Sequence, residues 1–331
     1  MKKTSMILQF KKQYNDIWRE AQKLSKPQNC ILCGKACNSF CNSHSVPQAV
    51  LRNITSKGKV FVAGKLLDES IFDAEKGINN SGTFRLICHD CDVKYFRDYE
   101  NPTAFSVIPN DKIMAEIALK NTLLEYNKKL ISYELYKNMG LSPILKTIKL
   151  DLQELKEDIT VYKKIIDDNT LGVFNIIFWK DLSYMTPIAS QCRIILDKDR
   201  DGGPLNDPYN FSPDIRMQPL HLSVFPYNGH TYITMFYHDN DEIYSKLKEQ
   251  LSVIDLKKVL SYINWLIFQY TENFFISEAV KNIIENNEKL KQICFENNGK
   301  PNFGILDSFS ESTDYKCIEE DEIPNMLEVQ L

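Results

Sequence analysis

Two Cys-x-x-Cys pairs constrain the fold of this chain more than any other feature of its sequence. The first pair is Cys30 and Cys33, the second is Cys88 and Cys91, and 54 residues separate them. A two-residue spacer lets both thiolates of a pair reach one ion, and two pairs supply the four ligands of a tetrahedral zinc site. The sequence therefore predicts a structural zinc ion that joins two distant segments.

Cysteine usage favours metal over disulfides. Six of the nine cysteines lie between residues 30 and 91, whereas Cys192, Cys294 and Cys317 are isolated. Clustered cysteines in a reducing compartment are typical of metal sites. The N-terminus is basic but lacks the apolar core of a signal peptide, and no apolar run is long enough to span a bilayer, so we expect a cytoplasmic protein.

The ligand set has rivals within the same segment. Cys37 and Cys41 follow Cys33 at four-residue intervals, which would place the three on one helical face, and His44 or His89 could also coordinate. The shared two-residue spacer of the outer pairs favours those four cysteines as the zinc ligands.

The net charge of −4 hides an asymmetry along the chain. Residues 1–60 contain eleven lysine and arginine residues and two acidic residues, a net charge of +9, so the remainder carries −13. A basic segment beside a zinc site is typical of a module that contacts phosphate. A solvated basic helix is the alternative interpretation.

Apolar periodicity and turn residues predict the secondary structure. We expect helices over residues 6–24, from Pro47 through Ile54, and over 92–99, 110–138, 145–168, 241–252, 255–270 and 276–296. We expect strands over 59–63, 83–87, 188–196, 220–225 and 231–236, with a hairpin turn at Asn228-Gly229. The aromatic stretches 174–179 and 262–270 are expected in the core.

These elements predict an α+β protein in several parts. The predicted parts are an N-terminal helix (1–27), a zinc-binding domain (28–108), a helical linker or antiparallel hairpin (109–170), a C-terminal α+β domain with a small antiparallel sheet (171–300) and a frayed acidic tail (301–331).

Three short motifs in the zinc-binding region resemble the HNH (ββα-metal) endonucleases in their zinc-stapled form. The motifs are CILC (30–33), SHSVP (43–47) and LICHDCD (86–92), and the resemblance covers about residues 28–104. It implies a treble-clef-type fold in which two Cys-x-x-Cys knuckles flank a β-hairpin and a helix.

The resemblance also implies roles for individual residues. His44 would be the general base that takes a proton from water, and its ordinary pKa of about 6.5 suits that task near neutral pH. Asp92, directly after the last cysteine, would ligate a catalytic divalent ion, Mg²⁺ or another hard cation. Ser43 and His89 are additional candidates. The zinc ion would hold only the scaffold.

Two departures from the family pattern bear on this interpretation. Many members carry Asp or Glu immediately before the histidine as a second ligand of the catalytic ion, whereas this chain has Ser43. The middle asparagine of the family, by its spacing from the second cysteine pair, falls near Thr83, while Asn79 and Asn80 lie a few residues earlier.

Two functions follow from this resemblance. The leading one is a metal-dependent endonuclease that hydrolyses nucleic-acid phosphodiesters, DNA in preference to RNA, in a bacterial restriction or anti-phage system. The alternative is a degenerate HNH module that binds nucleic acid or protein without catalysis. A protein partner or homodimer contact would involve the C-terminal region, and no membrane partner is expected.

Overall fold

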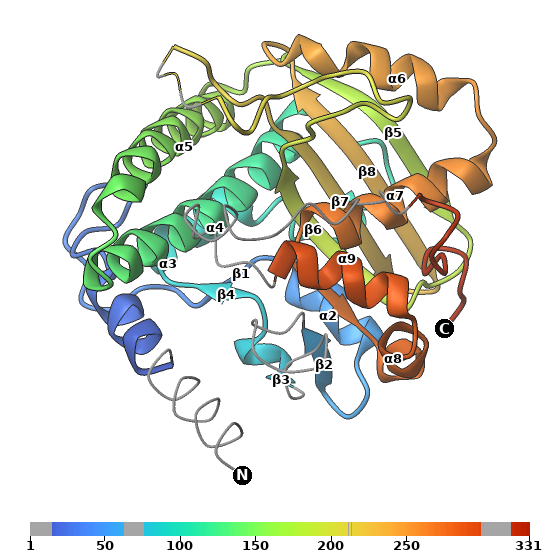
Figure 1. Cartoon of the computed structure of the whole chain (residues 1–331), viewed down its shortest axis with the longest axis horizontal. Helices are drawn as coiled ribbons and strands as arrows, with labels where there is room; N and C mark the ends of the chain where they lie inside the picture. The colour runs from blue at the N-terminus through green and yellow to red at the C-terminus, as the bar shows by residue number, and fades with distance from the viewer. Residues whose placement is uncertain (1–14, 63–75, 211, 213, 299–318) are drawn as a thin grey trace, which may run out of the picture.

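The computed structural model describes residues 15–62, 76–210, 212, 214–298 and 319–331 (Figure 1). Within these residues, seven antiparallel strands form the main sheet in the order β3-β2-β9-β6-β7-β8-β5. The strands are β2 (Lys59–Val62), β3 (Lys76–Gly77), β5 (Phe174–Leu182), β6 (Ile188–Ile194), β7 (Leu220–Tyr227), β8 (His230–His238) and β9 (Phe274–Ile276).

Helices cover both faces of this sheet. They are α2 (Gln48–Ile54), α3 (His89–Phe96), α4 (Asp111–Asn138), α5 (Ser142–Asp168), α6 (Ser245–Ser252), α7 (Leu256–Tyr270), α8 (Glu278–Glu285) and α9 (Glu288–Asn298), with short 3₁₀ turns at Ile78–Asn80, Pro102–Ala104 and Glu242–Tyr244. Residues 15–24 are also helical. None of the described helices is long and apolar enough to cross a membrane.

The sheet separates two hydrophobic cores. Along β9, Phe274 and Ile276 belong to the core beneath α6, α7, α8 and α9, whereas Phe275 belongs to the core beneath α2, α3, α4 and α5. On β8, Met235 belongs to the first of these cores and Phe236 to the second. Successive side chains of a strand point to opposite faces, so the sheet is the middle of three layers.

Several sequence predictions are confirmed by the element boundaries. Strands were expected near β6, β7 and β8, and the turn between the last two has Asn228 at φ 51° and Gly229 at φ 85°, as a two-residue hairpin of this kind requires. The sequence did not predict β5 and β9 as strands. The helix expected over 276–296 is two helices, because Asn286 and Asn287 separate α8 from α9.

One sheet crosses the predicted domain boundary. Strand β2 lies within the range 28–108, yet it pairs with β9 of the range 171–300, with Phe61 opposite Ile276. The range 109–170, expected as a linker or hairpin, forms the antiparallel helices α4 and α5, which pack on that sheet (Figure 1). Strands from the predicted zinc-binding and C-terminal ranges therefore lie in one sheet.

The end of the predicted acidic tail is packed rather than frayed. Ile323, Met326 and Leu327 are buried in the core with α7, and the backbone N–H of Met326 donates to Oδ1 of Asn264 at 2.9 Å. The acidic residues precede this apolar group, whose burial stabilises the segment. Residues 301–318 of the predicted tail, like residues 6–14 of the first predicted helix, lie outside the described residues.

Helix α4 is the element that both halves share. Its N-cap, Asn110, accepts a hydrogen bond from the backbone N–H of Ile113 at 3.0 Å. The middle of the helix is buried on every side, so neighbouring residues contact different layers. Asn121 donates to the carbonyl oxygen of Cys192 on β6 at 2.9 Å, while Lys120 contacts the segment that contains the cysteines.

Glu116, in the buried middle of α4, gives a test of the packing. Its Oε2 accepts from the backbone N–H of Tyr99 at 2.8 Å, and burial raises its pKa to about 7. A raised folded-state pKa makes the protein less stable as pH rises through about 7. Urea denaturation should therefore show that the free energy of unfolding of wild type falls relative to that of Glu116→Gln as pH rises from 6 to 8. The expected change in the difference is on the order of 1–2 kcal/mol.

The matched control is Glu134→Gln, on the same helix, whose carboxylate pairs with Lys137 at 3.3 Å. Its stability difference from wild type should change little over this pH range, since surface ion pairs contribute little. Equal pH dependence in the two variants would contradict the assignment of a buried, partly protonated Glu116.

Candidate metal centre and adjoining polar site

The structure brings the four predicted cysteines into one cluster. One Sγ atom from each of Cys30, Cys33, Cys88 and Cys91 lies within 4.8 Å of the others, and the Sγ atoms of Cys33 and Cys88 are 3.9 Å apart. Four thiolates around a tetrahedral zinc ion, each at about 2.3 Å, are separated by about 3.8 Å. The thiol geometry therefore suits a closed structural zinc site.

Local backbone structure positions each pair. Gly34 adopts φ 72° directly after the first pair, and its N–H donates to the carbonyl oxygen of Cys30 at 2.8 Å, which closes the turn. Helix α3 begins at His89, so its first turn presents Cys91 beside Cys88. A turn on one side and a helix start on the other thus bring the two pairs together.

The rival ligands lie outside this cluster. Cys37 Sγ donates to the carbonyl oxygen of Ser39 at 2.8 Å, and His89 is exposed at the start of α3. Burial raises the pKa of Cys41 to about 11, with a further contribution from the nearby carboxylate of Asp92. The structure thus favours the outer pairs that share the two-residue spacer.

A short antiparallel ribbon stands beside the cysteine cluster. Strand β1 (Ser43–His44) pairs with β4 (Thr83–Phe84), with His44 opposite Thr83, and α3 follows the ribbon in the chain. Helix α2, strands β2 and β3 and a 3₁₀ turn come between β1 and β4 in the chain, so the ββα unit expected from the resemblance stays a prediction. The two strands are separated by residues 45–82, which contain α2, β2 and β3, so the ribbon is not a tight hairpin.

The imidazole of His44 is fixed by a backbone carbonyl. Its Nε2 lies 2.9 Å from the carbonyl oxygen of Ile78, and because a carbonyl only accepts, Nε2 carries the proton. Burial lowers the pKa of His44, although the hydrogen bond to Ile78 opposes this shift. The ring is therefore neutral near pH 7, with the lone pair on Nδ1.

Asn79 supports the turn that presents this carbonyl. Its side-chain oxygen accepts from Nε2 of Gln48 at 2.7 Å, and its backbone oxygen accepts from Nδ2 of Asn42 at 2.9 Å. Thr83, the position expected from spacing for the family's asparagine, lies opposite His44 in the ribbon. Of these positions, Asn79 has the contacts that hold the 3₁₀ turn in place.

Asp92 contacts a buried lysine that the sequence did not reveal. Its Oδ1 accepts from Oγ of Ser43 at 2.5 Å and from Nζ of Lys120 at 3.3 Å. The same Nζ lies 2.8 Å from Oγ of Ser43, 3.0 Å from Oε1 of Glu100 and 3.7 Å from the centre of the Phe96 ring. Lys120 has no solvent-exposed surface.

Sequence patterns gave little indication of Lys120 or Glu100. Lys120 follows Ala118 and Leu119 in a stretch of α4 that is buried on every side, so no helical periodicity distinguishes it from a surface lysine. Glu100 lies after the end of α3, where the chain turns back towards Asp92. Only the tertiary structure brings these charges together.

These contacts do not suit a catalytic divalent ion bound between positions 43 and 92. Oγ of Ser43 and Oδ1 of Asp92 are both hydrogen-bonded to Nζ of Lys120. The positive charge of Lys120 already pairs with the carboxylates of Asp92 and Glu100, and it would weaken the binding of a second cation there. The expected ion-binding role of Asp92 therefore disagrees with the geometry.

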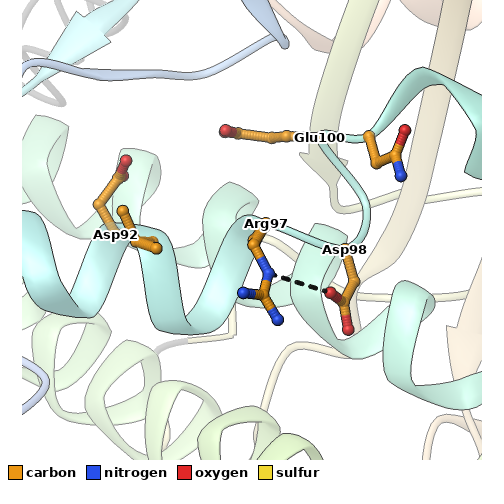
Figure 2. A pocket seen from close by; sticks show the side chains of 6 residues that line it. Asp92, Arg97, Asp98 and Glu100 are labelled. Carbon is orange, nitrogen blue, oxygen red and sulfur yellow. Dashed lines mark ion pairs between the residues drawn. The ribbon is translucent and has the colours of Figure 1, made fainter.

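An open pocket lies beside this cluster. Figure 2 shows the carboxylates of Asp92 and Glu100 pointing into one space above α3, whereas Arg97 and Asp98 project to the other side and form an ion pair at 3.7 Å. Val93 and Asn101 complete the lining. The pocket thus gives solvent access to the outer side of Asp92 and Glu100.

Metal analysis tests the cysteine cluster. Purified protein should contain about one tightly held zinc ion per chain, because four thiolates form a closed site. Cys91→Ser should lose the zinc and lower the thermal stability of the protein. Cys192→Ser, which changes a buried thiol outside the cluster, should retain the zinc. Folded wild-type protein without zinc would contradict the assignment.

Comparisons with known proteins do not assign the chain to a family. No family model, no curated protein and no solved structure matches it. The geometry of the cysteine cluster and of the polar site beside it is therefore the basis for the proposals below.

Proposed function

We propose that this chain is an HNH-like, zinc-stapled module that acts on nucleic-acid phosphodiesters, with His44 as the general base of a hydrolytic reaction. One observation carries the proposal: the neutral imidazole of His44 is oriented by the carbonyl of Ile78, in the β1–β4 ribbon that leads into Cys88 and Cys91 of the four-cysteine cluster. The basic charge of residues 1–60 agrees with a phosphate-bearing substrate.

The chemistry of the proposed reaction centres on Nδ1 of His44. Because Nε2–H is held by the Ile78 carbonyl, Nδ1 is the atom that accepts a proton from an attacking water. The water oxygen forms a bond to phosphorus, the ester P–O bond breaks, and its electron pair remains on the leaving oxygen. Zinc in the closed four-thiolate site would stabilise the fold and supply no chemistry to this reaction.

A second candidate function is binding of nucleic acid without cleavage. The observation that favours it is that Lys120 donates hydrogen bonds to both Ser43 and Asp92. These are the two positions where the family pattern places ligands of a catalytic ion. The two candidate functions share the fold and the zinc site, and they differ in what happens when His44 is removed.

Cleavage assays on plasmid DNA and on RNA separate the two candidates. If His44 is the general base, His44→Ala should reduce the cleavage rate by roughly 10²–10⁴, with zinc content and thermal stability close to wild type. The matched control is His230→Ala, which removes a histidine that pairs with Asp181 at 2.8 Å on the β5–β8 side of the sheet. Cleavage that is equal in wild type and His44→Ala would exclude the catalytic role.

The pH dependence of cleavage gives a further test. A general base works when it is deprotonated, and burial lowers the pKa of His44 below its ordinary value of about 6.5. The loss of cleavage on acidification, as His44 gains a proton, should therefore occur at lower pH than for an ordinary histidine. A rate that already falls between pH 8 and pH 7 would contradict a buried, neutral His44.

A further inference from the structure

Lys120 occupies a place where the HNH resemblance implies a metal ion. The resemblance places ligands of a catalytic ion at the residue before the histidine and at the residue after the last cysteine, which are Ser43 and Asp92 here. Both side chains are hydrogen-bonded to the same Nζ atom, at 2.8 Å and 3.3 Å. We propose that the ammonium group of Lys120 is the built-in cation of this site and replaces a divalent ion between Ser43 and Asp92.

The surroundings of Nζ are complete without any further ligand. An ammonium group has three N–H donors, and three oxygen atoms lie within reach, from Ser43, Asp92 and Glu100. The ring of Phe96 covers another side, with its centre 3.7 Å from Nζ. With all three donors paired, the ammonium group has no free donor for a substrate.

This arrangement accounts for the serine that departs from the family pattern. The hydroxyl of Ser43 accepts from Lys120 and donates to Asp92 Oδ1 at 2.5 Å. A carboxylate at position 43 has no proton to donate and would repel Asp92. Serine is therefore the side chain that suits a site in which the cation is an ammonium group rather than a metal ion.

Lys120 cannot easily move aside for an ion, because the next residue anchors α4 to the sheet. Asn121 donates to the carbonyl oxygen of Cys192 at 2.9 Å and accepts from Nε2 of Gln191 at 3.0 Å. Both contacts are buried. The backbone of α4 at Lys120 is thus fixed from the opposite side, and the side chain has no exposed surface into which it could swing.

Manganese binding tests this proposal independently of whether the protein cleaves nucleic acid. Zinc-loaded, full-length protein is titrated with Mn²⁺ alone, and free Mn²⁺ is measured by electron paramagnetic resonance. Asp92→Asn should leave the Mn²⁺ affinity of the wild-type protein unchanged within about twofold. Asp98→Asn is the matched control, because Asp98 lines the same pocket but pairs with Lys112 and Arg97.

Removal of the lysine should create the site that it blocks. Lys120→Ala leaves the oxygens of Ser43, Asp92 and Glu100 around an empty space, so Mn²⁺ should bind at least about tenfold more tightly than to wild type. The gain should disappear in Lys120→Ala/Asp92→Asn. Zinc content is measured in each variant, so that Mn²⁺ at the cysteines is recognised.

Two results would overturn the proposal. The first is an Asp92→Asn variant that binds Mn²⁺ tenfold or more weakly than wild type does. Asp92 would then hold a divalent ion beside Lys120. The second is a folded, zinc-loaded Lys120→Ala variant without any gain in Mn²⁺ affinity. If Lys120→Ala does not fold, the comparison of wild type with Asp92→Asn still decides. If the proposed role of His44 is wrong, the cleavage assays alone will show it, and the outcome of these Mn²⁺ titrations will be the same.

Discussion

The convergence of four thiolates is the constraint on which the N-terminal half depends. The ribbon strands β1 and β4 contain two residues each, and strands of that length do not hold a fold together by their own hydrogen bonds. The cysteine cluster joins the turn before β1 to the helix after β4, which fixes the ribbon between them. The position of His44 relative to α3 thus depends on the cysteine cluster together with the hydrophobic core that includes Phe84, Tyr95 and Phe96.

Helix α4 connects that small unit to the rest of the molecule. It contributes Lys120 to the polar site and Asn121 to the sheet, and these consecutive residues contact different layers. A helix surrounded by protein has no polar stripe, and its charged groups must be paired where they are buried. The polar cluster beside the zinc site is therefore a requirement of packing as well as a candidate site of chemistry.

The sequence predicted the local features well and the long-range ones poorly. Cysteine spacing identified the cluster, and Asn228-Gly229 identified the hairpin, because both signals lie within a few neighbouring residues. The pairing of β2 with β9 had no such signal, since β9 is three residues long and follows a helix. The burial of Lys120 could not be predicted for a related reason. Its acidic partners are Asp92, on α3, and Glu100, which follows α3 in the chain.

The strand pairing that crosses the two halves has a consequence for the order of assembly during synthesis. Both cysteine pairs are complete once residue 91 has been made, so zinc can join them early. Strand β2 must wait for β9, and at about 5–20 residues per second the interval from residue 61 to residue 276 lasts roughly 10–40 s. During that interval β2 lacks its partner β9, while all four cysteines of the cluster are already part of the chain. The main sheet is therefore completed only after β9 has been made, well after both cysteine pairs.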